Sequence, residues 1–263
     1  MTVNGPLTQG DDLRALLADV AAGRTSVDDA AAGLAALGVT TIDDFACLDV
    51  GRAQRKGVPE IVFGAGKTVD QFRAIIASFA AAAPSVVASK VSPEQAAAVE
   101  APPGGTLEWH ARAGMLVVRR SDWRAPEPRG VVGVLAGGTS DVAIADEAAI
   151  VCREMGARVL TAYDVGVAGV HRLAHPLREM TTDGAGVFVV AAGMEGALPS
   201  VVCGLVDVPV IGLPVSTGYG IGGRGEAALL GMLQSCSPGL SVVNIDNGVG
   251  AGVTAALIAR RTS

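Results

Sequence analysis

The fold of this chain is decided by the stretch VVGVLAGGTSD, residues 131–141. A short Val-rich run ends in two glycines, and hydroxyl and carboxylate residues then precede apolar residues at helical spacing over residues 142–155. This order predicts a buried strand, a tight turn and a helix. Backbone glycines let a ligand approach such a turn, and the amino end of a helix attracts phosphate. The plainer interpretation is that Ser140 or Asp141 only caps the helix.

The same alternation continues to the end of the chain. Further strands are predicted over residues 158–165, 187–192, 209–213 and 242–245, and helices over 168–180, 198–205, 226–234 and 249–260. Consecutive strand–helix units predict a three-layer α/β fold, with a parallel sheet between two helical layers. A connector with two prolines, residues 122–129, precedes this region. We therefore expect a catalytic α/β domain over residues 130–263 and a smaller α+β domain over residues 1–124.

The first 124 residues are less regular. Helices are predicted over residues 11–22 and 27–37, broken at Gly23, and strands over 60–64 and 86–89. A helix over residues 68–82 lies between these strands, another opens at Ser92-Pro93, and residues 106–118 hold further strands.

Composition limits the classes of function. The net charge is −6, which argues against a general nucleic-acid binder. Pro and Gly interrupt every long uncharged stretch, so no membrane span is expected. Residues 1–12 lack the pattern of a signal peptide, which favours a cytoplasmic protein. Only 17% of residues are charged, and this indicates that part of the surface is buried between identical subunits.

The cysteines are scattered and have neither zinc-site nor disulfide spacing; they are Cys47, Cys152, Cys203 and Cys236. Cys236 stands out because it lies in Gln234-Ser235-Cys236-Ser237-Pro238-Gly239, after an uncharged Gly-rich run. A lone thiol there could be a nucleophile. The alternative is a small buried hydrophobe.

Polar clusters also follow the predicted strands. Because the carboxyl ends of parallel strands meet at one edge, these clusters could converge on one crevice. Each has a plain structural alternative, such as a first-turn helix carboxylate for Glu195. The candidates are Gly138, Thr139, Ser140, Asp141, His171, Arg172, Met194, Glu195, Ser216 and Gly218.

The order of the clusters resembles the carboxyaminoimidazole ribonucleotide mutase family. The matching segments are Gly138-Thr139-Ser140-Asp141, Val170-His171-Arg172, Gly196-Ala197-Leu198-Pro199 and Gln234-Ser235-Cys236. The sequence departs from that family where Cys236 replaces a proline, where Glu195 enters the Gly-rich turn, and in its long amino-terminal extension.

With these departures, the sequence resembles the LarB family. Its members are the pyridinium-3,5-biscarboxylic acid mononucleotide synthases of nickel-pincer cofactor synthesis, a pathway that serves lactate racemase maturation. The similarity spans residues 48–259. Besides the clusters above, it includes Arg52, Arg55, Gly57, Pro59-Glu60, Gly66-Lys67-Thr68, Gln71, Gly218-Tyr219-Gly220 and Asn244-Ile245-Asp246-Asn247-Gly248. The resemblance implies a flavodoxin/Rossmann-like mutase domain that assembles into an octamer.

The resemblance also implies a reaction. Nicotinic acid adenine dinucleotide would receive a carboxylate from the co-substrate CO₂ on its pyridinium ring and lose AMP by hydrolysis. Cys236 would be the nucleophile, Glu195 an acid/base group and His171 a catalytic or orienting residue. Gly138, Thr139, Ser140, Asp141, Arg172, Met194, Ser216 and Gly218 would bind substrate. No tightly bound cofactor is expected, and Mg²⁺ is the candidate metal for the hydrolysis. The alternatives are a carboxyaminoimidazole ribonucleotide mutase and a non-catalytic dinucleotide-binding scaffold.

Overall fold

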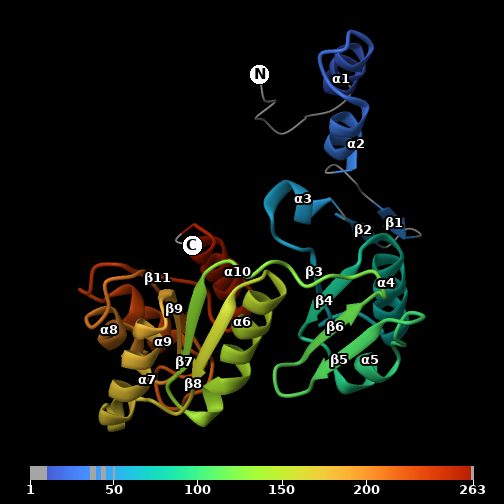
Figure 1. Ribbon diagram of the computed structural model, residues 1–263. Helices are drawn as coiled ribbons and strands as arrows, with labels where there is room; N and C mark the ends of the chain where they lie inside the picture. Colours follow the sequence, from blue (N-terminus) through green and yellow to red (C-terminus); the bar gives the residue numbers. More distant parts are fainter. Residues whose placement is uncertain (1–10, 36–39, 43–45, 50, 262–263) are drawn as a thin grey trace.

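The computed structural model describes residues 11–35, 40–42, 46–49 and 51–261. Its carboxyl-terminal part is built on a five-stranded sheet in which every pair of neighbours is parallel. The strands, in the order β11-β10-β9-β7-β8 across the sheet, are Leu240–Val242, Val210–Pro214, Ala185–Ala192, Val131–Ala136 and Arg158–Ala162 (Figure 1). Read in chain order this is the 2-1-3-4-5 order of flavodoxin-like sheets.

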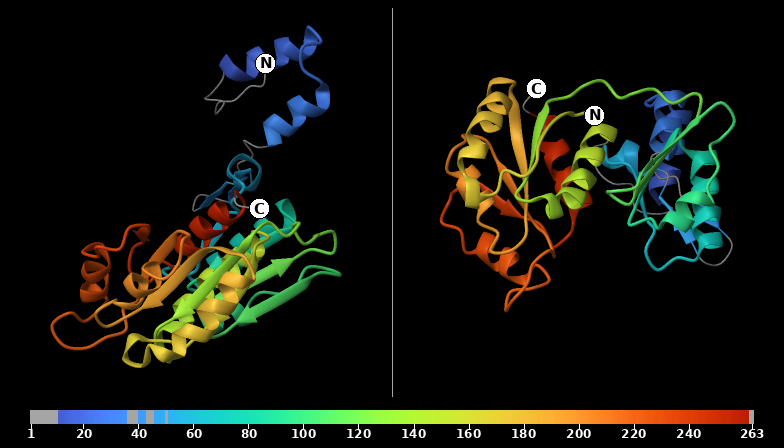
Figure 2. Two further views of the ribbon diagram at one scale, coloured as in Figure 1. Left: turned by 60° about the vertical axis from the view of Figure 1, so that its left-hand side comes forward. Right: turned by 90° about the horizontal axis from the view of Figure 1, so that it is seen from below.

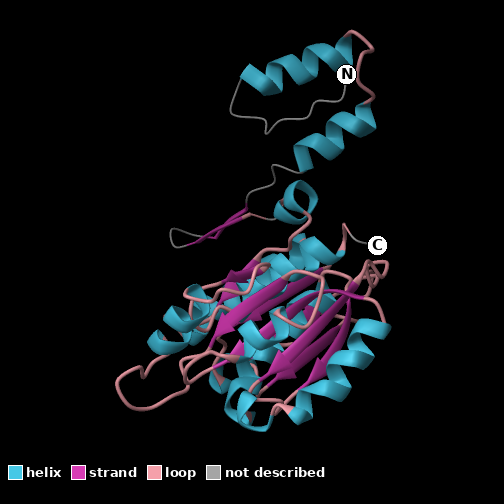
Figure 3. Ribbon diagram, turned by 90° about the vertical axis from the view of Figure 1, so that its left-hand side faces the viewer, coloured by secondary structure: helices cyan, strands magenta, loops and turns pink. Residues whose placement is uncertain are grey.

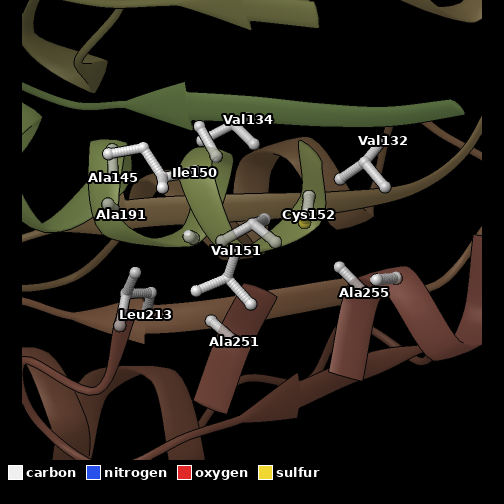
Figure 4. Close-up of a cluster of buried hydrophobic side chains, with 14 of the residues drawn as sticks. Val132, Val134, Ala145, Ile150, Val151, Cys152, Ala191, Leu213, Ala251 and Ala255 are labelled. Carbon is white, nitrogen blue, oxygen red and sulfur yellow. The ribbon is translucent and has the colours of Figure 1, made fainter. Parts of the chain in front are cut away.

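Helices cover both faces of this sheet (Figure 3). One face is covered by α6 (Val142–Glu154) and α10 (Gly248–Ala259), which pack together through small residues. The other face carries α7 (His171–Thr182), α8 (Leu198–Cys203) and α9 (Glu226–Leu233). Figure 4 shows part of the first core, where Val151 and Cys152 of α6 lie near Ala251 and Ala255 of α10. The predicted three-layer α/β fold is confirmed.

The amino-terminal part has a four-stranded mixed sheet in the order β3-β4-β6-β5. These strands are Ile61–Phe63, Ser85–Ser89, Met115–Arg119 and Thr106–His110. One face is covered by α4 (Val69–Ala82) and α5 (Pro93–Ala97), both of which begin with capping boxes. Further elements are α1 (Asp11–Ala21), α2 (Val27–Ala35), β1 (Thr40–Ile42), β2 (Ala46–Leu48) and α3 (Arg52–Lys56). The helices α1 and α2 stand apart from both sheets (Figure 2).

The two parts share one core. Val87, Met115 and Val117 of the mixed sheet belong to the same buried cluster as Val134 and Val151. Helix α6 therefore lies between the two sheets and packs on both (Figure 1). This explains why its sequence is apolar on more than one face.

The position of the last strand differs most from the sequence prediction. The last strand is Leu240–Val242, not residues 242–245. Pairing of Leu240 with Val210 sets its register, and the chain turns after Val243, whose N–H donates to the carbonyl of Gly212. The second helix of the amino-terminal hairpin is described over Val27–Ala35, and residues 36–37 of the prediction lie outside the described residues. Among the described residues, no helix has the length and apolar character needed to cross a membrane.

Candidate active site

A pocket of about 650 Å³ opens at the carboxyl ends of β7, β8 and β9. It lies where the chain order of the strands reverses, between β7 and β9, the position at which such sheets bind ligands. The pocket is lined by Gly137, Gly138, Ser140, Asp141, Asp164, Gly166, Val167, Ala168, Arg172, Ala192, Gly193, Met194, Glu195, Ala197, Leu198, Thr217, Gly218 and Tyr219. The structure thus brings together seven of the predicted site residues: Gly138, Ser140, Asp141, Arg172, Met194, Glu195 and Gly218.

The Asp141 side chain connects two loops that line this pocket. Its side chain is buried, with 6% of its surface exposed. One carboxylate oxygen accepts from the N–H of Gly138 at 2.8 Å and the other from the N–H of Gly193 at 3.2 Å. Burial raises the pKa of this carboxyl above its ordinary range, and the two backbone donors oppose the shift. Asp141 therefore ties the loop after β7 to the loop after β9.

A third loop is joined to these two. The Thr217 hydroxyl donates to the carbonyl of Ser140 at 3.4 Å, and the N–H of Met194 donates to the carbonyl of Thr217 at 3.2 Å. This approach requires glycine at residue 193, because a Cβ there would lie 2.2 Å from the Thr217 carbonyl oxygen. The loops that follow β7, β9 and β10 thus form one hydrogen-bonded rim.

Arg172 has a partner that sequence reasoning missed. Its guanidinium contacts the carboxylate of Asp164 at 2.7 Å, and both residues line the pocket. Asp164 follows β8 and has a φ of 58°, a left-handed conformation that favours glycine. Asp164 falls inside the strand predicted over residues 158–165, which ends at Ala162 in the structure, and a carboxylate within that run was the signal available for it.

Glu195 lies at the rim and is exposed. The preceding residue, Met194, has a φ of 54° and is 42% exposed. Backbone strain of this kind persists only where surrounding structure enforces it, and it gathers at functional sites. Behind this turn, α9 packs so closely that a Cβ on Gly231 would lie 2.4 Å from the Glu195 carbonyl oxygen. The carboxylate of Glu195 is therefore carried on a firmly held turn that faces the pocket.

Three predicted residues are exposed and do not line the pocket: Thr139, His171 and Ser216. Thr139 and Ser216 are chain neighbours of lining residues. His171 is the first residue of α7, next to the lining residue Arg172.

Cys236 lies outside the pocket as well. It is an exposed free thiol in the segment between α9 and β11, so it precedes the amino end of β11, whereas the pocket lies at carboxyl ends. Its segment is fixed to α8 by hydrogen bonds from Ser200 to Ser235 at 2.8 Å and from the Ser237 hydroxyl to the Ser200 carbonyl at 3.0 Å. As the sequence predicted, a helix ends just before it, at Leu233.

The described part of the site holds no cluster typical of a metal centre. Within the described ranges, no group of three or more His, Cys, Asp or Glu side chains is arranged to hold a metal ion. Cys152 and Cys203 are buried, and burial raises the pKa of both thiols, that of Cys152 to about 12.

Comparisons with known proteins match two segments of the chain to two families. Residues 39–120 match the LarB/PurE-like N-terminal domain family, and residues 131–263 match the AIR carboxylase family. An uncharacterized protein of Methanocaldococcus jannaschii is 39% identical over 255 residues, which cover 95% of this chain and 98% of that protein. An N5-carboxyaminoimidazole ribonucleotide mutase of Thermotoga maritima is 31% identical over 134 residues, 48% of this chain and 73% of the mutase. A mutase of the same description from Pyrococcus abyssi is 33% identical over 132 residues, 49% of this chain and 70% of that protein.

Proposed function

Because this chain belongs to the LarB family, with a LarB-like amino-terminal domain and an AIR carboxylase domain, we propose that it carboxylates the pyridinium ring of nicotinic acid adenine dinucleotide and hydrolyses its phosphoanhydride. The products would be pyridinium-3,5-biscarboxylic acid mononucleotide and AMP. The family assignment supports a carboxylase- or mutase-type role in nickel-pincer cofactor synthesis. The observation that carries the proposal is the convergence of the Gly-rich turn, Arg172 and Glu195 on one pocket.

The chemistry requires a nucleophile because the pyridinium ring and CO₂ are both electrophiles. A thiolate that adds to a ring carbon converts the ring into an electron-rich dihydropyridine. A ring carbon then attacks CO₂, a base takes the proton from that carbon, and expulsion of the thiolate restores aromaticity. Covalent catalysis thus replaces one prohibitive step with easier ones. The hydrolysis consumes one water and releases AMP.

The pocket offers groups for the other roles. The Gly137-Gly138 turn and Ser140 precede α6, where backbone N–H groups and the helix dipole favour phosphate. Arg172 can bind phosphate oxygens in a bidentate manner. Glu195, exposed at the rim, is our candidate for the base that takes the ring proton. His171, at the start of α7, would orient the substrate, and Thr139, Ser216 and Gly218 would complete the binding surface.

The position of Cys236 bears on assembly. Near it, α9 presents exposed apolar side chains, with Leu230 64% and Leu233 62% exposed, and Tyr219 at the pocket rim is 81% exposed. A helix that is apolar on all sides is typical of a buried element. We propose that these surfaces join subunits of a homo-octamer, and that the thiol of one copy completes the pocket of another. The helix dipole at Leu233 disfavours a thiolate, so the cationic ring would have to stabilise it.

One observation favours a second candidate. The carboxyl-terminal half is similar to proteins described as N5-carboxyaminoimidazole ribonucleotide mutases, and His171 lies in a matching segment. That reaction needs no nucleophilic thiol, so a Cys236→Ala variant would retain mutase activity.

The experiment offers the protein each candidate substrate in turn, nicotinic acid adenine dinucleotide and N5-carboxyaminoimidazole ribonucleotide. With nicotinic acid adenine dinucleotide and ¹³C-bicarbonate, the proposal predicts AMP together with a nucleotide whose ring carries one labelled carboxylate. A parallel reaction with a chelator tests whether Mg²⁺ assists the hydrolysis. Conversion of N5-carboxyaminoimidazole ribonucleotide alone would establish the second candidate. Binding of the dinucleotide without any product would establish the non-catalytic scaffold.

A further inference from the structure

Cations of the amino-terminal domain pair with acidic residues of α6. Arg112 contacts Asp146 at 2.6 Å, Lys90 contacts Glu147 at 2.5 Å, and Arg119 is paired with Glu154. The carboxylate of the second pair is the most buried of the three, because Glu154 is 9% exposed and Asp146 is 17% exposed. Glu147 is 2% exposed and Lys90 is 32% exposed, whereas Arg112 is 64% exposed. A carboxylate as buried as Glu147 is costly unless it has a counter-charge.

Glu147 has only part of its bonding capacity satisfied. Its Oε1 accepts from Lys90, while its Oε2 is buried and has no hydrogen-bond partner among the described residues. The start of α10 presses against this side chain, because a Cβ on Gly248 would lie 2.6 Å from the Glu147 Cβ. Nothing larger than hydrogen fits there. Among the described residues, Lys90 is the cation that pairs with this carboxylate.

A second carboxylate, that of Asp246, lies two residues before Gly248, which packs on Glu147. Burial of Glu147 raises its pKa most, Lys90 lowers it, and the like charge of Asp246 raises it further. Asp246 is also attached to the candidate active site. Its Oδ1 accepts from the N–H of Ser216 at 2.8 Å, and its own N–H donates to the carbonyl of Pro214. Ser216 leads directly into Thr217 and Gly218, which line the pocket.

The backbone is strained at both ends of this arrangement. Lys90 has a φ of 52° and Asp246 a φ of 55°, two of the five described non-glycine residues with positive φ. Such conformations cost free energy and are retained where they serve a site. At Lys90 the strain accompanies an ion pair to α6, and at Asp246 it accompanies the hydrogen bond to Ser216.

We propose that Lys90 and Glu147 are positioning residues through which the amino-terminal domain holds the pocket loop formed by residues 216–218. Lys90 neutralises Glu147, and the neutral pair lets the Asp246 carboxylate remain beside it and bound to the Ser216 N–H. Without Lys90, an ionised Glu147 repels the Asp246 carboxylate, and Asp246 releases Ser216. The inference concerns the site of the proposed function but does not depend on its substrate.

Hydrogen exchange of the full-length protein without substrate tests this arrangement. In Lys90→Gln, we expect exchange in residues 214–218 to accelerate by about tenfold or more, through local opening of the loop. In the double variant Lys90→Gln/Glu147→Gln, the repulsion is gone, and exchange there should return to within about twofold of wild type. The matched control is Arg112→Gln, which breaks a neighbouring pair between the same domain and α6 and should leave residues 214–218 unchanged.

The outcomes separate positioning from simple docking of the domain. Equal acceleration in Lys90→Gln, Arg112→Gln and the double variant would overturn the proposal, because it would indicate general loosening of the interface. Unchanged exchange in Lys90→Gln would also overturn it. Since no turnover is measured, these results stand whether or not the protein carboxylates nicotinic acid adenine dinucleotide.

Discussion

The carboxylate of Asp141 accepts a hydrogen bond from the backbone N–H of Gly193, 52 residues further along the chain, at 3.2 Å. The first residue opens α6 and the second follows β9, so this bond joins the two sides of the switch point. The other carboxylate oxygen of Asp141 accepts from the N–H of Gly138 in the turn after β7. One buried side chain thus sets the spacing of the two loops between which a substrate would bind.

We expect Asp141→Ala to lower the free energy of unfolding by about 1–3 kcal/mol, because two partly buried backbone N–H donors lose their acceptor. Urea unfolding followed by circular dichroism measures this. Thr139→Ala is the matched control, since Thr139 is exposed on the same turn and should change stability little. Equal stability of Asp141→Ala and wild type would show that Asp141 does not stabilise the two loops.

The contribution of Asp141 to stability should depend on pH. Burial raises the pKa of its carboxyl in the folded protein above the ordinary value of 3.8. The folded state then binds more protons than the unfolded state between 3.8 and the raised pKa. The stability advantage of wild type over Asp141→Ala should therefore be largest below 3.8 and should decrease as pH rises through the folded pKa. An advantage that grows with pH over this range would contradict the assigned direction.

Glu195→Gln should slow carboxylation by about 10²- to 10⁴-fold if Glu195 moves a proton. The substitution preserves volume, and Glu195 is exposed, so the melting temperature should stay near that of wild type. Steady-state kinetics and thermal unfolding provide both measurements. A loss below about tenfold, with unchanged dinucleotide binding, would reduce Glu195 to a structural residue of the turn.

Leu233→Glu should disrupt assembly and activity together. The side chain is 62% exposed on α9, and a charge placed in an apolar subunit interface would lack a partner. Light scattering gives the mass, and AMP release gives the activity. A wild-type protein that is monomeric while it carboxylates the dinucleotide would contradict the proposed assembly.

Much of the carboxyl-terminal fold could be predicted, because each apolar run such as residues 187–192 alternates with a helical pattern and a Gly-rich turn. The last strand was misplaced because Val242, Val243 and Ile245 are equally apolar, and only pairing with Val210 fixes the register at Leu240. Along one chain, apolar composition cannot distinguish a strand from the turn that follows it.

Part of the site was predicted from the ends of the predicted strands. Strand ends identified Ser140, Arg172 and Glu195, which the pocket brings together. Glu147 reads from the sequence as an ordinary carboxylate in the first turns of a helix, yet it is buried against Lys90 because a second domain covers α6. Contacts between segments that are distant along the chain leave no local pattern in the sequence. The position of Cys236 outside the pocket could not be predicted for the same reason.

In the proposed reaction, the Cys236 thiol carries the ring carboxylation. The most direct measurement compares wild type and Cys236→Ser in transfer of ¹³C-bicarbonate to nicotinic acid adenine dinucleotide, followed by mass spectrometry. The hydroxyl preserves the shape of the side chain but is a poor nucleophile and leaving group. We predict a labelled carboxylate on the ring with wild type and none above background with Cys236→Ser, although both bind the dinucleotide. Near-normal labelling by Cys236→Ser would contradict the covalent mechanism.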